Sequence, residues 1–220
     1  MTMVRELVPE DWIINPLPTP PRSYAGLLGD NAWQRLPAAV RRRFSRRLHC
    51  GECVIYRGEV LRTRISRLGR WLVQLARLVG GPLPLESQAH QPSVVSVYGG
   101  RHDGDQRWSR QYSRRHRFPQ MVHSSKRFAG PSGLEEHIAP GLAIALKLEA
   151  QADRLIFRQI AWCLCLGPWR LRLPRWLLPL QVEVAHVHRN PREFDFVMSV
   201  RHHRWGELIS QHARYQELPS

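Results

Sequence analysis

Lysine is almost missing from this sequence. The 220 residues include 31 arginines but only two lysines, Lys126 and Lys147, and the formal net charge is +15. So strong a bias toward arginine is more typical of a general codon preference than of a dedicated anion site, which weakens the usual inference from charge to nucleic-acid binding. The basic runs at 41–47 and 114–117 lack any recognised nucleic-acid-binding signature and are interpreted as solvated faces. Nucleic-acid binding is therefore a third, disfavoured hypothesis.

Long apolar runs, a secretory signal and a disulfide framework are also missing. No stretch approaches the roughly 18 uninterrupted apolar residues of a membrane-spanning helix. The N-terminus has no basic segment followed by an apolar one, and four cysteines are too few for a disulfide scaffold at this length. We therefore expect a cytoplasmic, reduced protein.

Catalytic motifs are equally scarce. No serine occupies a Gly-x-Ser-x-Gly elbow, and no Gly-rich strand–turn–helix segment indicates a nucleotide site. No catalytic residue and no cofactor are assigned, and a non-enzyme is favoured.

Two metal patterns are present, and each has a simpler interpretation. Cys50 and Cys53 have zinc-ligand spacing and could be completed by Cys163 and Cys165, but the latter pair reads as small hydrophobic residues on the strand face of Leu155 and Phe157. A histidine set near Asp195 is interpreted as ordinary cross-strand pairs on a solvated face; its members are His186, His188 and His212. No metal is therefore assigned.

Residues 141–215 alternate between apolar and polar side chains, which is typical of antiparallel strands with one buried face. Turns at 150–153, 189–192 and 203–206 define three registers. The first pairs Leu148 with Leu155, the second pairs His186 with Asp195, and the third pairs Asp195 with Arg214.

The preceding chain contains further strands and a few helices. Strands are predicted over 52–63, 93–98, 106–116, 121–128 and 134–138, and helices over 23–28, 37–47 and 67–79. Ser66 is placed to cap the last helix. Prolines crowd residues 1–22, which are interpreted as a tail, and residues 23–217 as one β-rich domain.

The fold class that follows is α+β, mainly antiparallel β. We expect a curved sheet, half-barrel or barrel of about eight to ten strands, because open sheets of that size curl or close. The N-terminal helices and the 67–79 helix should cover it.

The segment 165–179 is predicted to be a loop in which tryptophans and arginines alternate with leucines. Such a composition suits a membrane interface, but a crossover segment with its apolar side packed on the barrel end is the favoured interpretation. The residues assigned to this membrane or lid loop are Trp169, Arg172, Arg175 and Trp176.

Several motifs together resemble one bacterial family, the "domain of unknown function 4166". They are Leu-Pro-Ala-Ala-Val-Arg-Arg-Arg-Phe at 36–44, Arg57-Gly58, Arg67-Leu68-Gly69, the run at 106–110 and the run at 174–179. The resemblance covers about residues 24–215. Family members are often fused behind saccharopine-dehydrogenase-like or short-chain-dehydrogenase-like domains, which implies an oxidoreductase on another chain as a partner and this chain as the domain standing alone. The resemblance implies no known activity.

The leading hypothesis is a non-catalytic domain that binds a hydrophobic or lipid-like molecule inside the curved sheet, with contact to a membrane surface as a further expectation. The second hypothesis is an accessory or substrate domain for an oxidoreductase. The residues predicted to line the ligand site are Ile144, Leu146, Phe157, Phe194, Phe196, Met198 and Tyr215.

Overall fold

A computed structural model describes residues 22–78, 83–84, 86, 89–100, 104–167 and 169–218. The proline-rich segment predicted at 1–22 lies outside these residues except for Arg22. In the described part of the chain no helix is long and apolar enough to cross a bilayer.

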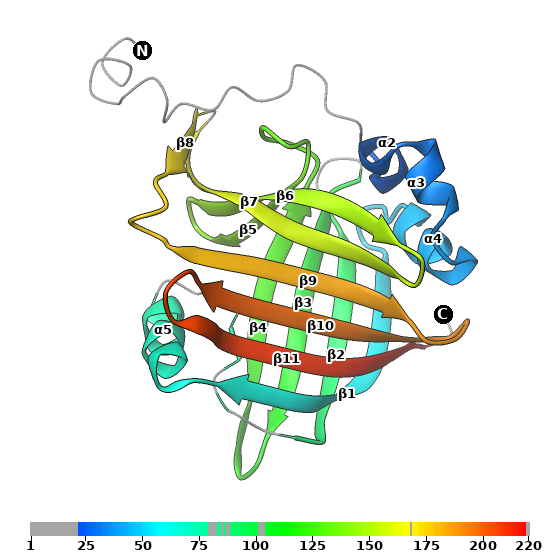
Figure 1. Cartoon of the computed structure of the whole chain (residues 1–220). Helices are drawn as coiled ribbons and strands as arrows, with labels where there is room; N and C mark the ends of the chain where they lie inside the picture. Colours follow the sequence, from blue (N-terminus) through cyan, green and yellow to red (C-terminus); the bar gives the residue numbers. More distant parts are fainter. Residues whose placement is uncertain are drawn as a thin grey trace.

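Eleven antiparallel strands form one sheet, and ten of them close into a barrel (Figure 1). The barrel closes where β6 pairs with β7. The extra strand, β8, pairs antiparallel with the second half of β7. The strands are β1 (Cys53–Ile65), β2 (Gln91–Gly99), β3 (Gln106–Arg114), β4 (Arg117–Arg127), β5 (Glu135–Ala139), β6 (Leu142–Gln151), β7 (Arg154–Leu166), β8 (Trp169–Leu173), β9 (Leu180–His188), β10 (Glu193–His202) and β11 (Gly206–Glu217). The prediction of a mainly antiparallel barrel is confirmed.

Helices lie at the two ends of the barrel (Figure 1). Three short helices pack near the end of β9 that carries His186; they are α2 (Tyr24–Leu28), α3 (Asp30–Gln34) and α4 (Ala38–Ser45). At the other end α5 (Arg67–Leu78) rests on the start of β11, where the amide of Ser66 donates to the Leu208 carbonyl at 2.8 Å. Ser66 Oγ accepts from the Gly69 amide at 3.0 Å, so the predicted cap is confirmed.

Two of the three predicted hairpin registers differ from the structure. Leu148 pairs with Phe157 instead of Leu155, a shift of two positions that keeps these three side chains on their predicted face. His186 pairs with Phe196 instead of Asp195, and this one-position shift moves His186 into the barrel. The shift arises because Asn190 Oδ1 accepts from the amides of Arg192 and Glu193, so the loop spans five residues. Asp195 does pair with Arg214, as predicted.

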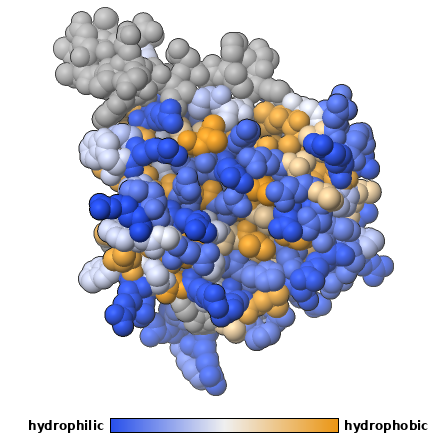
Figure 2. All heavy atoms as spheres, viewed as in Figure 1, coloured by the Kyte–Doolittle hydropathy of each residue, from blue (hydrophilic) through white to orange (hydrophobic). Residues whose placement is uncertain are grey.

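Two large, connected clusters form most of the core, and a third holds only Ala145, Ala161 and Cys163. The first joins β1–β4, β10 and β11 with Val73 of α5, and the second joins α2–α4 with β6 and β7. Val182 and Val184 of β9 pack against both. The outer face of β9, β10, β11 and β1, which faces the viewer in Figure 2, is mostly hydrophilic. The functional question therefore concerns the interior.

Candidate functional site: a cavity inside the barrel

The barrel encloses a cavity of about 460 Å³ at the end where α5 lies. This volume falls within the range of about 300–1,000 Å³ that is usual for small-molecule sites. The wall is built by β3, β5, β6, β7, β9 and β10 together with α5. Among the lining residues in the described part of the chain, only Arg110 and Glu136 carry charge. The other lining residues are Leu72, Leu75, Ala76, Leu83, Tyr112, Ile138, Leu142, Ile144, Trp162, Leu178, Leu180, Val182, Val184, Phe196, Met198 and Val200.

The charged base of the cavity belongs to a buried network from β3, β4 and β5. Glu136 Oε1 accepts from Ser124 Oγ at 2.7 Å, and Glu136 Oε2 lies 3.1 Å from Lys126 Nζ. Arg110 Nη1 donates to Ser124 Oγ at 3.1 Å, whereas Arg110 Nη2 is 3.7 Å from Glu136 Oε1. Two cations therefore share one carboxylate in the middle of the barrel.

Burial and charge act in opposite directions on this network. Burial raises the pKa of Glu136, but Lys126 and Arg110 outweigh it and hold that pKa at about 2. Burial lowers the pKa of Lys126, Glu136 raises it, and the net shift is downward. Each opposite charge therefore offsets part of the cost that burial imposes on the other.

Aromatic side chains fill the opposite end of the barrel. The Tyr24 hydroxyl donates to Gln106 Oε1, and Phe44 packs at 5.0 Å from the His186 ring. The Arg43 guanidinium lies 4.0 Å over the Phe194 ring. Helices α2–α4 therefore close this end with side chains, and the cavity occupies the other.

The residues predicted to line a ligand site separate into two groups. Ile144, Phe196 and Met198 line the cavity. The other four are buried in the two core clusters instead. Leu146 and Phe157 belong to the cluster of α2–α4, and Phe194 and Tyr215 to the cluster of β1 and β11.

Sequence reasoning missed Arg110, Lys126 and Glu136, although a usable signal was present. Arg110 lies two positions from the buried Trp108 and Tyr112 and so shares their face of the strand. Lys126 lies four positions from the buried Val122 and shares its face in the same way. A period of two therefore assigns these charges to the inner face. Strands are predicted over 106–116 and 121–128, but without assigned faces.

The segment predicted as a tryptophan–arginine loop is partly a strand. Trp169 and Arg172 belong to β8, which pairs with the second half of β7, whereas Arg175 and Trp176 follow in the connection to β9. Alternation over 169–173 is only five residues long, which is too short to distinguish a strand from a loop. Trp176 is 74% exposed, and Leu178 of the same connection lines the cavity.

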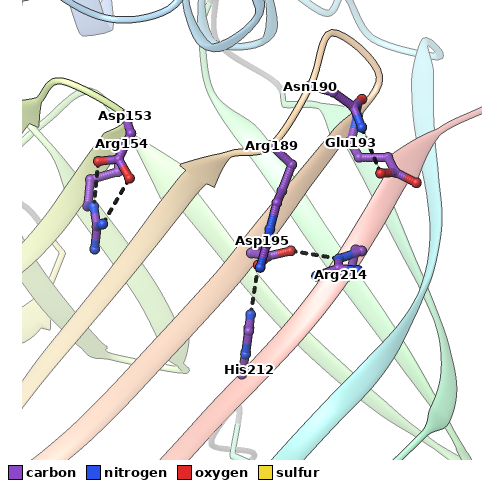
Figure 3. Close-up of polar contacts among 8 residues, drawn as sticks. All are labelled: Asp153, Arg154, Arg189, Asn190, Glu193, Asp195, His212 and Arg214. Carbon is purple, nitrogen blue, oxygen red and sulfur yellow. Dashed lines mark hydrogen bonds and ion pairs between the residues drawn. The ribbon is translucent and has the colours of Figure 1, made fainter.

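The prediction that three histidines share one face with Asp195 holds for His212 but not for His186. Asp195 lies outside the barrel between three cationic or ring nitrogens (Figure 3): Arg189 Nη2 at 2.7 Å, His212 Nε2 at 2.8 Å and Arg214 Nε at 3.0 Å. His186 points into the barrel instead, and its ring is 3% exposed. Burial raises the pKa of Asp195, but its three partners lower it overall. Two arginines and His212 therefore share one buried carboxylate on the outer side of the sheet.

A different cluster brings Glu135, His137 and Cys165 within 4.8 Å of one another on the outer face. Arg170 Nε already contacts both Glu135 oxygens, at 3.0 and 3.2 Å, so a metal ion there would have to displace it. The prediction that Cys163 and Cys165 share the strand face of Leu155 is wrong. A bulge that leaves Ile160 unpaired reverses the alternation of side chains beyond it. Burial raises the pKa of both thiols, that of Cys163 to about 12.

The basic run at 41–47 is not one solvated face. Arg43 is buried against Phe194, Arg42 donates to the Pro191 carbonyl, and Arg46 pairs with Glu217 at 2.9 Å. These three arginines therefore help to attach α4 to the barrel.

The fold and the cavity together define a closed antiparallel β-barrel with a largely apolar internal site. The chain belongs to the family described as "Domain of unknown function (DUF4166)", whose model matches residues 36–215. The comparison with curated proteins found no match, and neither did the comparison with solved structures.

Proposed function

We propose that this protein is a non-catalytic carrier that binds a hydrophobic or lipid-like molecule in the barrel cavity. The observation that supports this most directly is the apolar wall around about 460 Å³ of space. Apolar surface that borders a cavity lacks the contacts it would make in a packed core. A ligand of complementary shape recovers those contacts and removes the wall from water.

The surroundings of the cavity support contact with an anionic membrane surface. Trp71, Trp176 and Trp205 are each at least 60% exposed at the α5 end of the barrel. Arginines flank them at 67, 70, 77, 172 and 175. Exposed tryptophan beside arginine is favourable at the headgroup level of a bilayer, where a lipid-like ligand would be acquired or released.

Filling the cavity tests the carrier proposal. N-phenylnaphthylamine, an uncharged probe that fluoresces in apolar sites, is expected to bind the purified protein. Val184→Phe adds bulk to the cavity wall and should weaken this binding at least about tenfold, because the larger ring occupies the ligand's space.

Val197→Phe is the matched control, because Val197 lies on the outer face of β10 and is 37% exposed. Its affinity for the probe should equal that of the wild type. Equal binding by all three proteins, or no binding by the wild type, would remove the carrier proposal.

A further inference from the structure

We infer that the ligand is an anionic amphiphile whose head group binds Arg110 at the base of the cavity while its hydrocarbon tail lies along the apolar wall. This inference rests on the proposed carrier function and specifies the chemical class of the ligand. A free carboxylic acid of medium chain length is the simplest member of that class.

The hydrogen bonding of Arg110 is incomplete. A guanidinium has five N–H donors. Among the residues that the structure describes, only Ser124 accepts a hydrogen bond from Arg110, and the Glu136 oxygen at 3.7 Å is beyond hydrogen-bond distance. Arg110 is nevertheless 8% exposed and lines the cavity. The donors of Arg110 that lack a protein acceptor therefore remain available to a ligand in the cavity.

The charge at this point favours an anion over a cation. Arg110 and Lys126 are both buried, and Glu136 is the one acidic side chain that contacts them in the described part of the chain. Its carboxylate is already engaged by Lys126 Nζ and Ser124 Oγ. A second carboxylate would balance the remaining positive charge and could accept two parallel hydrogen bonds from Arg110.

The rest of the cavity determines the direction and the length of the ligand's hydrocarbon tail. Leu72 and Leu75 of α5, with Leu178, line the cavity beside exposed tryptophans, so the tail extends from the base toward that end. A heavy atom of a ligand occupies roughly the 30 Å³ of a liquid water molecule, so 460 Å³ holds about fifteen. Dodecanoate, with its carboxylate, is of this size.

A series of head groups on one tail tests the inference. Dodecanoate, dodecanol and dodecylamine are titrated calorimetrically into the full-length protein at neutral pH, below their aggregation concentrations. Dodecanoate should bind at least about tenfold more tightly than dodecanol, because hydrogen bonds to charged groups are stronger than neutral ones. Dodecylamine should bind most weakly, because Arg110 and Lys126 repel it.

Variants identify the residue responsible. Arg110→Gln should abolish the preference for dodecanoate over dodecanol and leave dodecanol affinity within about twofold, since that ligand depends on the apolar wall. Arg107→Gln is the matched control, because Arg107 is an exposed arginine on the same strand; its preference should be unchanged. Glu136→Gln should increase the preference, because it removes the competing carboxylate.

The outcomes separate this inference from the carrier proposal. Equal affinities for dodecanoate and dodecanol, or tightest binding of dodecylamine, would overturn the anionic class and leave the carrier proposal standing. No binding of any of the three, together with no binding of N-phenylnaphthylamine, would overturn both. Should Arg110→Gln not fold, the wild-type series alone still decides the head group.

Discussion

His186 is an imidazole enclosed by five aromatic rings. Its ring stacks on Phe194 at 5.3 Å, and the other four rings lie between 5.0 and 6.1 Å away; they belong to Phe44, Trp108, Phe157 and Phe196. Burial lowers the pKa of His186 well below its ordinary value, and Arg43, Lys126 and Arg110 lower it further. The native state therefore holds this side chain neutral.

This neutrality predicts acid sensitivity. Below a pH of about 6.5 the unfolded chain binds a proton at His186 that the native chain does not, so stability should fall by about 1 kcal/mol per pH unit from this residue. Urea unfolding of the wild type and of His186→Leu between pH 7.5 and 5.5 measures the effect. The variant should lose less stability over this interval. Parallel losses in the two proteins would contradict the assignment.

Helix α5 is held close to the barrel at a glycine. A Cβ built on Gly69 would lie 2.3 Å from the Leu208 carbonyl oxygen and 3.1 Å from Ile65 Cγ2. The same carbonyl accepts the Ser66 amide, so the helix start and the start of β11 share one contact. Since α5 supplies Leu72, Leu75 and Ala76 to the cavity, its position shapes that site.

Gly69→Ala should therefore destabilise the protein by about 1–3 kcal/mol, the usual cost of overpacking. Helix propensity alone would favour alanine by about 1 kcal/mol, so the sign of the change reports the close approach. The free energy of unfolding in urea and the affinity for N-phenylnaphthylamine should both fall.

Gln74→Ala serves as the reference for α5, because Gln74 is exposed on the same helix. It should change stability by no more than about 0.5 kcal/mol. A Gly69→Ala protein as stable as this reference would show that α5 tolerates a shift away from β11.

At the scale of the whole molecule, the proposed membrane contact would combine the net charge of +15 with the exposed tryptophans at the α5 end. Electrostatic attraction to an anionic bilayer extends only about a Debye length, whereas burial of an indole ring at the headgroup level adds a salt-insensitive contribution. Both contributions are expected where the cavity lies.

We expect the protein to bind vesicles of phosphatidylglycerol and phosphatidylcholine more tightly than vesicles of phosphatidylcholine alone, with an affinity that falls as salt rises. Replacing Trp71 and Trp176 together by serine should weaken co-sedimentation with the anionic vesicles by about tenfold. Tyr98→Ser, at the α4 end of β2, should have no effect. Equal losses in both variants would argue against docking through the α5 end.

The alternation of apolar and polar residues predicted most strands and the faces of several. It worked for Asp195 opposite Arg214, because a three-residue turn after His202 and a bulge at Leu208 together restore the predicted pairing. It failed for His186, because the Asn190 side chain lengthens a turn by one residue, and for Cys163, because a bulge at Ile160 reverses the faces. Such local irregularities change parity without a clear trace in composition.

By itself, the sequence determined that the chain builds a curved antiparallel sheet with one apolar face, because side-chain alternation depends only on neighbours along a strand. Only the tertiary structure decided that ten strands close, that α2–α4 fill one end and that the other end keeps a cavity. It also decided that Arg110, Lys126 and Glu136, from three different strands, meet beneath that cavity. Enclosed volume and charge balance depend on side chains distant in sequence, so no local pattern specifies them.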